Sequence, residues 1–150
     1  MTTYIDSSAL VAVYVPERFS KSARSTVRKT GQIPFNALHQ LEVPNAFELL
    51  VGRGLITRGQ CRAILEQLQD DLESNRLLPS AIDLDRVFID ASELSRLHTA
   101  QLLARSLDLL HAAAAHVMGC TTFVSADDRQ LAVAKASGLT VVDIKRRTRR

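Results

Sequence analysis

Short apolar segments alternate with longer amphipathic segments along almost the whole chain, and this alternation constrains the fold most strongly. The short segments have the length and composition of β-strands, whereas the longer ones repeat apolar residues at helical spacing. This is the pattern of βαβ units, in which helices connect parallel strands. The sequence therefore predicts an α/β fold with a mostly parallel sheet.

Five segments are predicted to form strands, at residues 3–6, 32–36, 77–82, 121–125 and 139–144. The predicted helices cover residues 8–14, 17–29, 39–51, 57–72, 83–97, 106–118 and 127–136. Thr57 and Asp83 have side chains that accept hydrogen bonds from a first helical turn, so we expect each to be an N-cap. Pro16 interrupts the first helical pattern, because proline cannot continue a helix.

The chain is long enough for one domain with a buried core. It has 150 residues, of which 46% are hydrophobic and 23% are charged, and a chain of this size buries roughly 70% of its unfolded surface. The formal net charge is +3, but the last six residues hold five basic groups, so residues 1–144 carry 14 basic against 16 acidic side chains. We therefore expect a slightly acidic domain at 1–144 and a basic tail at 145–150.

The sequence predicts a cytoplasmic protein that does not bind a membrane. No basic-then-apolar leader precedes Asp6. The richest apolar stretch, residues 109–118, contains two histidines and is shorter than the roughly 20 residues that a membrane helix needs. Cys61 and Cys120 have no zinc or redox spacing and are predicted to be buried thiols.

Four acidic residues stand where a sequence normally avoids charge. Asp6 ends the first apolar strand, Asp127 follows the fourth strand by two residues, and Glu42 and Asp108 lie near the starts of apolar helices. In a parallel α/β sheet, the carboxyl ends of the strands and the starts of the following helices share one edge, where ligands bind. We therefore expect the four carboxylates to converge.

Four converging carboxylates must protonate or bind a cation. Ligand sets made only of oxygen select Mg²⁺ or Mn²⁺, and such an ion can activate water against a phosphodiester. Each acid also has a structural explanation: Asp127 as an N-cap, Asp108 as a partner of the helix dipole and Glu42 in an ion pair. Asp128 competes with Asp127 for any role in the site.

Four blocks of sequence resemble the PIN-domain nucleases, and within them the VapC-type toxins of bacterial toxin–antitoxin pairs. The blocks are YIDSSAL at 4–10, LEVPNA at 41–46 with GLIT at 54–57, LDLLHAAA at 107–114, and FVSADDRQL at 123–131 with ASGL at 136–139. The resemblance implies a three-layer Rossmann-like fold with strand order 3-2-1-4-5 and helices on both faces of the sheet.

The resemblance also implies a Mg²⁺-dependent endoribonuclease, with Mn²⁺ able to substitute. Such a protein forms a homodimer and is neutralised by a cognate, VapB-like antitoxin with which it forms a complex. Carried over by motif, Asp6 and Asp108 bind the metal directly, while Glu42 and Asp127 complete the acidic pocket through water. RNA is the implied substrate.

Supporting and substrate-binding residues follow from the same blocks and from the charge pattern. Ser8 is expected to orient the Asp6 carboxylate, although it could instead cap a helix, and Ser125 is a second supporting hydroxyl. Lys21, Arg24 and Arg28 form a basic helix face that could follow RNA phosphates or be solvated. His111, three residues after Asp108, could contact phosphate or be a buried histidine with its own partners.

Two other functions are weighed against the nuclease. A receiver-like phosphoacceptor domain also gathers acids at the edge of a parallel sheet, but it requires an aspartate ending the third strand and a lysine ending the fifth. Here Asp83 follows a weak strand, and Lys145 is followed only by the tail. A PIN-like scaffold without catalysis is the other alternative, and retention of all four acids argues against it.

Overall fold

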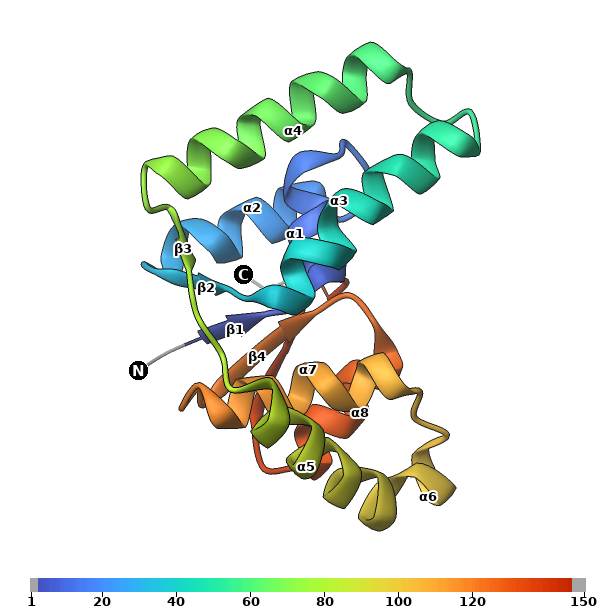
Figure 1. Ribbon diagram of the computed structural model, residues 1–150. Coiled ribbons are helices and arrows are strands. Elements are labelled where there is room, and N and C mark those ends of the chain that lie inside the picture. The colour runs from blue at the N-terminus through green and yellow to red at the C-terminus, as the bar shows by residue number, and fades with distance from the viewer. Residues whose placement is uncertain (1–2, 147–150) are drawn as a thin grey trace.

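The computed structural model describes residues 3–146, whose parallel strands lie between two layers of helices (Figure 1). In one sheet, β1 (Thr3–Ile5) pairs with β4 (Thr122–Ser125), which pairs with β5 (Thr140–Asp143), and all three are parallel. A second parallel sheet joins β2 (Ile33–Phe35) to β3 (Leu77–Pro79). The α/β class and the five strand positions agree with the predictions.

The prediction of one continuous five-stranded sheet is wrong, because the strands divide between β1 and β2. These two strands lie side by side in the order that the resemblance implies. The carbonyl of Phe35 accepts from the N–H of Ser80, so the backbone groups of Phe35 face β3. Backbone groups alternate along a strand, so those of Pro34 face β1, and proline has no N–H to donate.

Helices cover both faces of the strands, as predicted. The helices above the strands in Figure 1 are α1 (Ser7–Tyr14), α2 (Ser20–Lys29), α3 (Ala37–Gly52) and α4 (Arg58–Glu73). The helices below them are α5 (Leu84–Leu94), α6 (Ala100–Leu102), α7 (Ser106–Val117) and α8 (Asp128–Ala136).

Adjacent residues of β1 belong to two different hydrophobic cores. Ile5 packs in the core beneath α1 to α4, with Leu10 and Phe47, while Tyr4 packs in the core above α5, α7 and α8, stacked on Phe123 at 5.5 Å. Successive side chains of a strand point to opposite faces, so β1 separates the two cores. Asp6, the next residue, therefore lies at the end of β1, between the two layers of helices.

Local sequence signals account for most helix ends. The side chains of Thr57 and Asp83 accept from backbone N–H groups of α4 and α5, as predicted for N-caps. The helix after Pro16 begins at Ser20 rather than at residue 17, because the hydroxyl of Ser20 accepts from the N–H of Glu17 and forms a turn there.

The region between α5 and α7 differs from the prediction of a single helix to residue 97. After Leu94 the chain forms a π-helical turn, η1 (Ser95–Thr99), and then α6. Leu103 has a positive φ of 54°, a left-handed conformation that cannot continue a right-handed helix. This turn delivers Arg105 and the start of α7 to the edge of the strands.

Other predictions concern the thiols, the tail and membranes. Cys61 and Cys120 are buried, as predicted. Residues 147–150 of the predicted basic tail lie outside the described residues, whereas Lys145 pairs with Asp128 and Asp143, each at 2.9 Å. Across residues 3–146, no helix has the length and apolar character needed to cross a membrane.

Candidate active site

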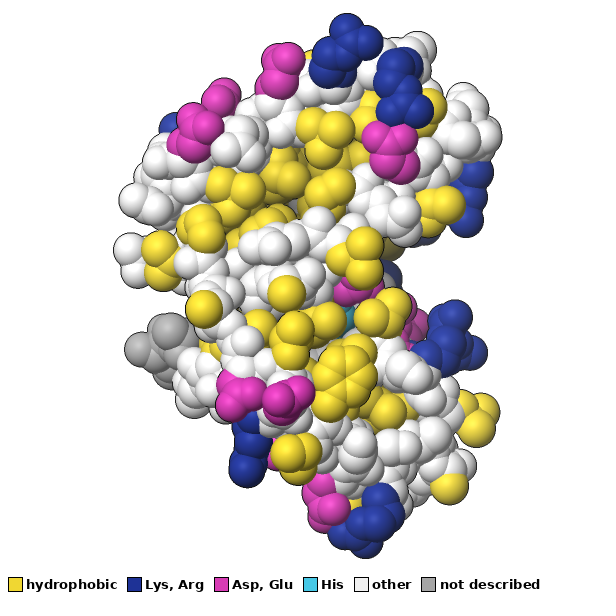
Figure 2. Space-filling view, viewed as in Figure 1, with side chains coloured by type: hydrophobic (Ala, Val, Ile, Leu, Met, Phe, Trp, Pro, Cys, Tyr) yellow, Lys and Arg dark blue, Asp and Glu magenta, His cyan; other side chains and the backbone are white. Residues whose placement is uncertain are grey.

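A cavity of about 750 Å³ opens where β1 and β4 end, between the two layers of helices. Glu42, Asp108 and Asp127 all line it, from α3, α7 and the start of α8. Figure 2 shows acidic side chains in the notch between the two halves of the surface. Three of the four predicted acids therefore share one cavity, at the predicted edge of the strands.

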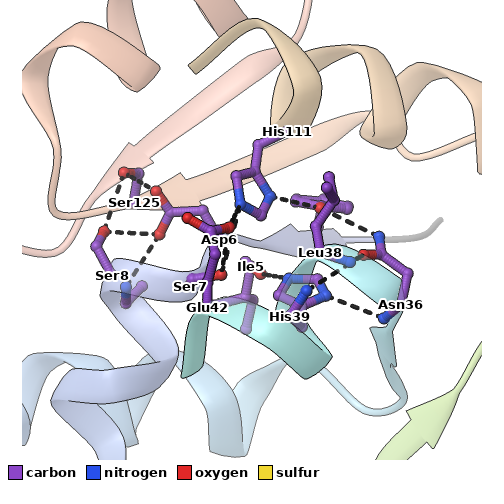
Figure 3. Close-up of polar contacts among 12 residues, drawn as sticks. Ile5, Asp6, Ser7, Ser8, Asn36, Leu38, His39, Glu42, His111 and Ser125 are labelled. Atoms are coloured by element: carbon purple, nitrogen blue, oxygen red, sulfur yellow. Dashed lines mark hydrogen bonds and ion pairs between the residues drawn. The ribbon is translucent and has the colours of Figure 1, made fainter. Parts of the chain in front are cut away.

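Asp6, the fourth acid, is fully buried at the start of α1. Its Oδ1 accepts from the hydroxyl of Ser8 at 2.8 Å and from the N–H of Ala9 at 2.9 Å, and its Oδ2 accepts from the hydroxyl of Ser125. Burial raises the pKa of the Asp6 carboxyl, opposed by the neighbouring His111 and by these hydrogen bonds. Both supporting serines are in place to orient this carboxylate (Figure 3).

Glu42 is held by two side chains from other helices. The hydroxyl of Ser7 donates to Glu42 Oε1 at 3.1 Å, and Nε2 of His111 contacts the same oxygen. Burial raises the pKa of the Glu42 carboxyl, but the bonds from His111 and Ser7 outweigh burial and keep the pKa below its usual range. Glu42 is therefore an anion whose side chain stays 20% exposed at the cavity.

Asp108 lies in the first turn of α7 and is only 4% exposed. Its Oδ2 accepts from the backbone N–H of Arg105 at 2.8 Å, which fixes the entry into the helix. The Arg105 side chain also lines the cavity. A helix-capping role and a place in the site therefore coincide in Asp108.

The structure separates Asp127 from Asp128, which the sequence left as competitors. Asp127 lines the cavity while its Oδ1 caps α8, accepting from the N–H groups of Arg129 and Gln130. The Asp128 side chain is 85% exposed and pairs with Lys145 at 2.9 Å. Asp127 is therefore the acid that faces the site.

The candidate substrate-binding residues lie outside the cavity lining. Lys21, Arg24 and Arg28 are exposed on α2, where Nε of Arg24 donates to the carbonyl of Val13 at 3.0 Å. His111 is fully buried beneath Glu42, so its place is that of a histidine with protein partners rather than of a phosphate contact. The basic face on α2 is exposed.

Sequence reasoning missed five polar residues that line the cavity: Ser7, Glu17, Arg105, Ser106 and Gln130. Ser7 directly follows the first acid, so its position was a usable signal. Arg105 stands three residues before Asp108, at the N-cap of α7, and that spacing could also have been recognised. Gln130 lies within an ordinary helical pattern and gives no signal in the sequence.

The donor set fits a hard divalent cation. The four acids offer only carboxylate oxygens: Asp6, Glu42, Asp108 and Asp127. A carboxylate has about four acceptor sites. Three of those of Asp6 are used by hydrogen bonds, which leaves one acceptor site free on Oδ2 for a cation. No three His, Cys, Asp or Glu side chains in residues 3–146 are placed to hold an ion together. Mg²⁺ binds through one or two carboxylates and keeps several waters, so two acids suffice.

Gln130 carries a buried side-chain oxygen, Oε1, with no hydrogen-bond partner among the described residues. An unpaired buried acceptor costs about 1–3 kcal/mol. We therefore expect Gln130→Met, which keeps an unbranched chain, to raise the free energy of unfolding by about 1 kcal/mol, measured by urea denaturation. Gln67→Met, at an exposed position of α4, is the control. A less stable Gln130 variant would contradict the prediction.

The fold and the cavity define an α/β protein with a carboxylate site where its parallel strands end. A family model described as the PIN domain matches residues 3–136. The chain therefore belongs to the PIN-domain family.

Solved structures agree with this fold. FitAcB from Neisseria gonorrhoeae has a TM-score of 0.69 at 14% identity, and the match covers 96% of this chain and 99% of that one. PAE2754 from Pyrobaculum aerophilum has a TM-score of 0.61 at 21% identity, with coverage of 97% and 90%. No curated protein matches the sequence.

Proposed function

We propose that this PIN-domain protein is a Mg²⁺-dependent endoribonuclease and the toxin of a VapC-type toxin–antitoxin pair. The observation that carries the proposal is the convergence of Glu42, Asp108 and Asp127 on one cavity. Asp6 is buried behind the lining residue Ser8, whose hydroxyl donates to it. Membership of the PIN-domain family supports the reaction class, because PIN domains are typically metal-dependent nucleases. The blocks of VapC-like sequence support the toxin role.

Asp6 and Asp108 would hold the divalent cation, with Glu42 and Asp127 reaching it through water. When bound, such an ion lowers the pKa of its water and neutralises charge on the leaving oxygen of a phosphodiester. Mn²⁺ would substitute, because it accepts the same oxygen ligands. Ser8 and Ser125 keep Asp6 in one orientation through their hydrogen bonds.

The other side chains of the cavity position the substrate and the attacking water. Glu42 is anionic and can accept a hydrogen bond from that water, which orients one lone pair toward phosphorus. The Arg105 guanidinium at the cavity wall can donate to a phosphate oxygen. Lys21, Arg24 and Arg28 would add salt-sensitive attraction to the RNA backbone.

The receiver-like alternative loses its two diagnostic residues. Asp83 caps α5 and does not end a strand, since β3 stops at Pro79. Lys145 pairs with Asp143 and Asp128 and does not line the cavity. The non-catalytic PIN scaffold remains the second candidate, and it predicts the same fold without cleavage.

The toxin role also implies partners, a second copy of the chain and a VapB-like antitoxin. Large apolar side chains on the surface support an interface of some kind: Leu41, Phe88 and Ile89 are 71%, 56% and 62% exposed. A contiguous exposed apolar patch is typical of surfaces that bind protein, and Phe88 and Ile89 are neighbours on α5. We propose a homodimer that joins the antitoxin in one complex in the cytoplasm.

The activity is tested with purified, chelator-treated protein on mixed single-stranded RNA. We expect no cleavage without metal and cleavage after Mg²⁺ or Mn²⁺ is added. Asp127→Asn should lower the rate by about tenfold to 100-fold, as loss of a group that supports a metal site does. Asp128→Asn, the neighbouring exposed acid, should cleave like the wild type.

Cleavage that is unaffected by chelator, or equal loss in both aspartate variants, would overturn the proposal. Complete inactivity of folded wild-type protein under all these conditions would favour the scaffold. The toxin role has a separate readout, since expression should arrest growth and co-expression of the neighbouring open reading frame should relieve the arrest.

A further inference from the structure

A chain of buried hydrogen bonds runs from the start of α3 to Glu42 through residues of β1 and α7 (Figure 3). Nδ2 of Asn36 donates to Oη of Tyr4 at 3.2 Å, and Oη lies 2.7 Å from Nδ1 of His111. Nε2 of His111 then contacts Oε1 of Glu42. Asn36, Tyr4 and His111 are fully buried, so the chain is shielded from solvent.

The backbone sets the direction of this chain. The N–H of Leu38 donates to Oδ1 of Asn36 at 2.9 Å, so the amide must present its NH₂ group to Tyr4. Oη of Tyr4 thus accepts from Asn36 and must donate its own hydrogen elsewhere. Among residues 3–146, the acceptor for that hydrogen is Nδ1 of His111. A phenol has an ordinary pKa of about 10, so this hydrogen stays on the oxygen at neutral pH.

The tautomer of His111 follows from that direction. A neutral imidazole has one donor and one acceptor nitrogen. If Nδ1 accepts from Tyr4, the proton is on Nε2 and is donated to Glu42. Ser7 donates to the same Oε1 at 3.1 Å, so both contacts hold one oxygen of the Glu42 carboxylate.

His111 also connects the two halves of the site. It lies three residues after Asp108 on α7, on the same side of the helix, whereas Glu42 comes from α3 on the opposite side of the strands. A bond from His111 to Glu42 therefore fixes the position of Glu42, from one layer of helices, relative to Asp108, from the other layer.

We propose that His111 is a positioning residue of the cavity: Tyr4 fixes its Nε2–H tautomer, and that N–H holds the Glu42 carboxylate in a fixed position relative to Asp108. This inference rests on the proposed nuclease function for its kinetic consequences. Its structural content, the tautomer and the bond to Glu42, does not depend on activity.

Amide substitutions distinguish positioning from simple packing. The amide nitrogen of Gln can reach the place of Nε2, whereas that of Asn is limited to the place of Nδ1. We expect His111→Asn to lower kcat by about tenfold to 100-fold with little change in KM, and His111→Gln to keep most of the rate. Equal losses in both variants, at equal stability in urea, would overturn the proposal.

Tyr4→Phe removes one hydroxyl and keeps the stacked ring. A long-range ¹H–¹⁵N spectrum of the protein with ¹⁵N-histidine reports which ring nitrogen carries the proton, with His111→Gln identifying the signal. We expect protonated Nε2 and unprotonated Nδ1 in the wild type, and a loss of that single tautomer in Tyr4→Phe. A proton on Nδ1 in the wild type contradicts the inferred chain.

A double variant tests whether His111 acts through Glu42. In the Glu42→Gln background, adding His111→Asn should cause no further loss of rate, because residues that act as a unit are not additive. Additive losses would overturn the proposal. Wild-type protein that cleaves no RNA would refute the nuclease function alone, since the spectrum would still decide the tautomer.

Discussion

Asp6→Asn is expected to lower RNA cleavage by about 10³-fold, equivalent to about 4 kcal/mol of transition-state stabilisation, while making the folded protein more stable. The loss of rate follows because an amide is a weak ligand for a hard cation, and Asp6 is one of the two acids proposed to bind it. Asn keeps the volume of Asp, so the fold around β1 should be retained.

The gain in stability follows from the sign of the pKa change. Burial raises the pKa of Asp6 in the folded protein above its value in the unfolded chain. At neutral pH the ionised carboxylate therefore favours the unfolded state, and stability decreases as pH rises above the unfolded pKa of about 3.8. Removing the charge should add about 0.5–2 kcal/mol at pH 7, as changes at a destabilised active site often do.

The hydrogen bonds around Asp6 permit this replacement. The amide oxygen of Asn can still accept from Ser8 and Ala9, while its NH₂ group faces Ser125, whose hydroxyl can accept. Urea denaturation at pH 7 and pH 4 measures the effect, and the gain should be larger at pH 7. Asp128→Asn, an exposed acid, should change neither rate nor stability in this way.

A variant that cleaves RNA at the wild-type rate would exclude Asp6 as a metal ligand. A variant that is inactive and also less stable at pH 7 would show that Asp6 supports the fold as an anion. The two readouts therefore test the metal-binding role and the buried charge separately.

The positions of the acids could be predicted because each signal is local. Asp6 directly follows an apolar strand and Asp127 follows another, and the geometry of parallel strands brings such residues to one edge. The choice between Asp127 and Asp128 could not be made from the sequence. It depends on Lys145, which draws Asp128 outward from a position distant in the chain.

The division of the strands and the role of His111 depend on pairings that the sequence does not display. Pro34 is visible in the sequence, but only the bond from Ser80 to Phe35 shows that its missing N–H faces β1. His111 has the spacing of a site residue, yet its partners Tyr4 and Glu42 come from two other elements. Periodicity predicts elements well, and it says little about which buried polar atoms meet.

His39 should make the protein progressively less stable in acid. Burial lowers the pKa of His39 to about 3, with a further contribution from the neighbouring His111. The bond from its Nε2 to the carbonyl of Ile5, at 2.8 Å, acts in the opposite direction and is outweighed. Its unfolded pKa is about 6.5, so between these values the unfolded state binds a proton that the folded state does not.

The sign of this effect is fixed by linkage. Stability falls as pH decreases below 6.5, by up to about 1.4 kcal/mol per pH unit, and by about 4–5 kcal/mol in total near pH 3. That is a large part of the 5–15 kcal/mol typical of a folded domain. Protonation of Asp6 acts in the opposite direction in the same range, so the absolute slope mixes both groups.

Comparison with His39→Gln isolates the histidine. Gln at this third helical position can still accept from the N–H of Asn36 in a capping box, but it cannot bind a proton. We expect His39→Gln to lower stability at pH 7, because the contact with Ile5 is lost. Between pH 6.5 and pH 4, its free energy of unfolding should fall less steeply than that of the wild type, by about 1 kcal/mol per pH unit. His116→Gln, which removes an exposed histidine, is the control. If that variant flattens the decline and His39→Gln does not, the acid sensitivity arises outside this buried histidine.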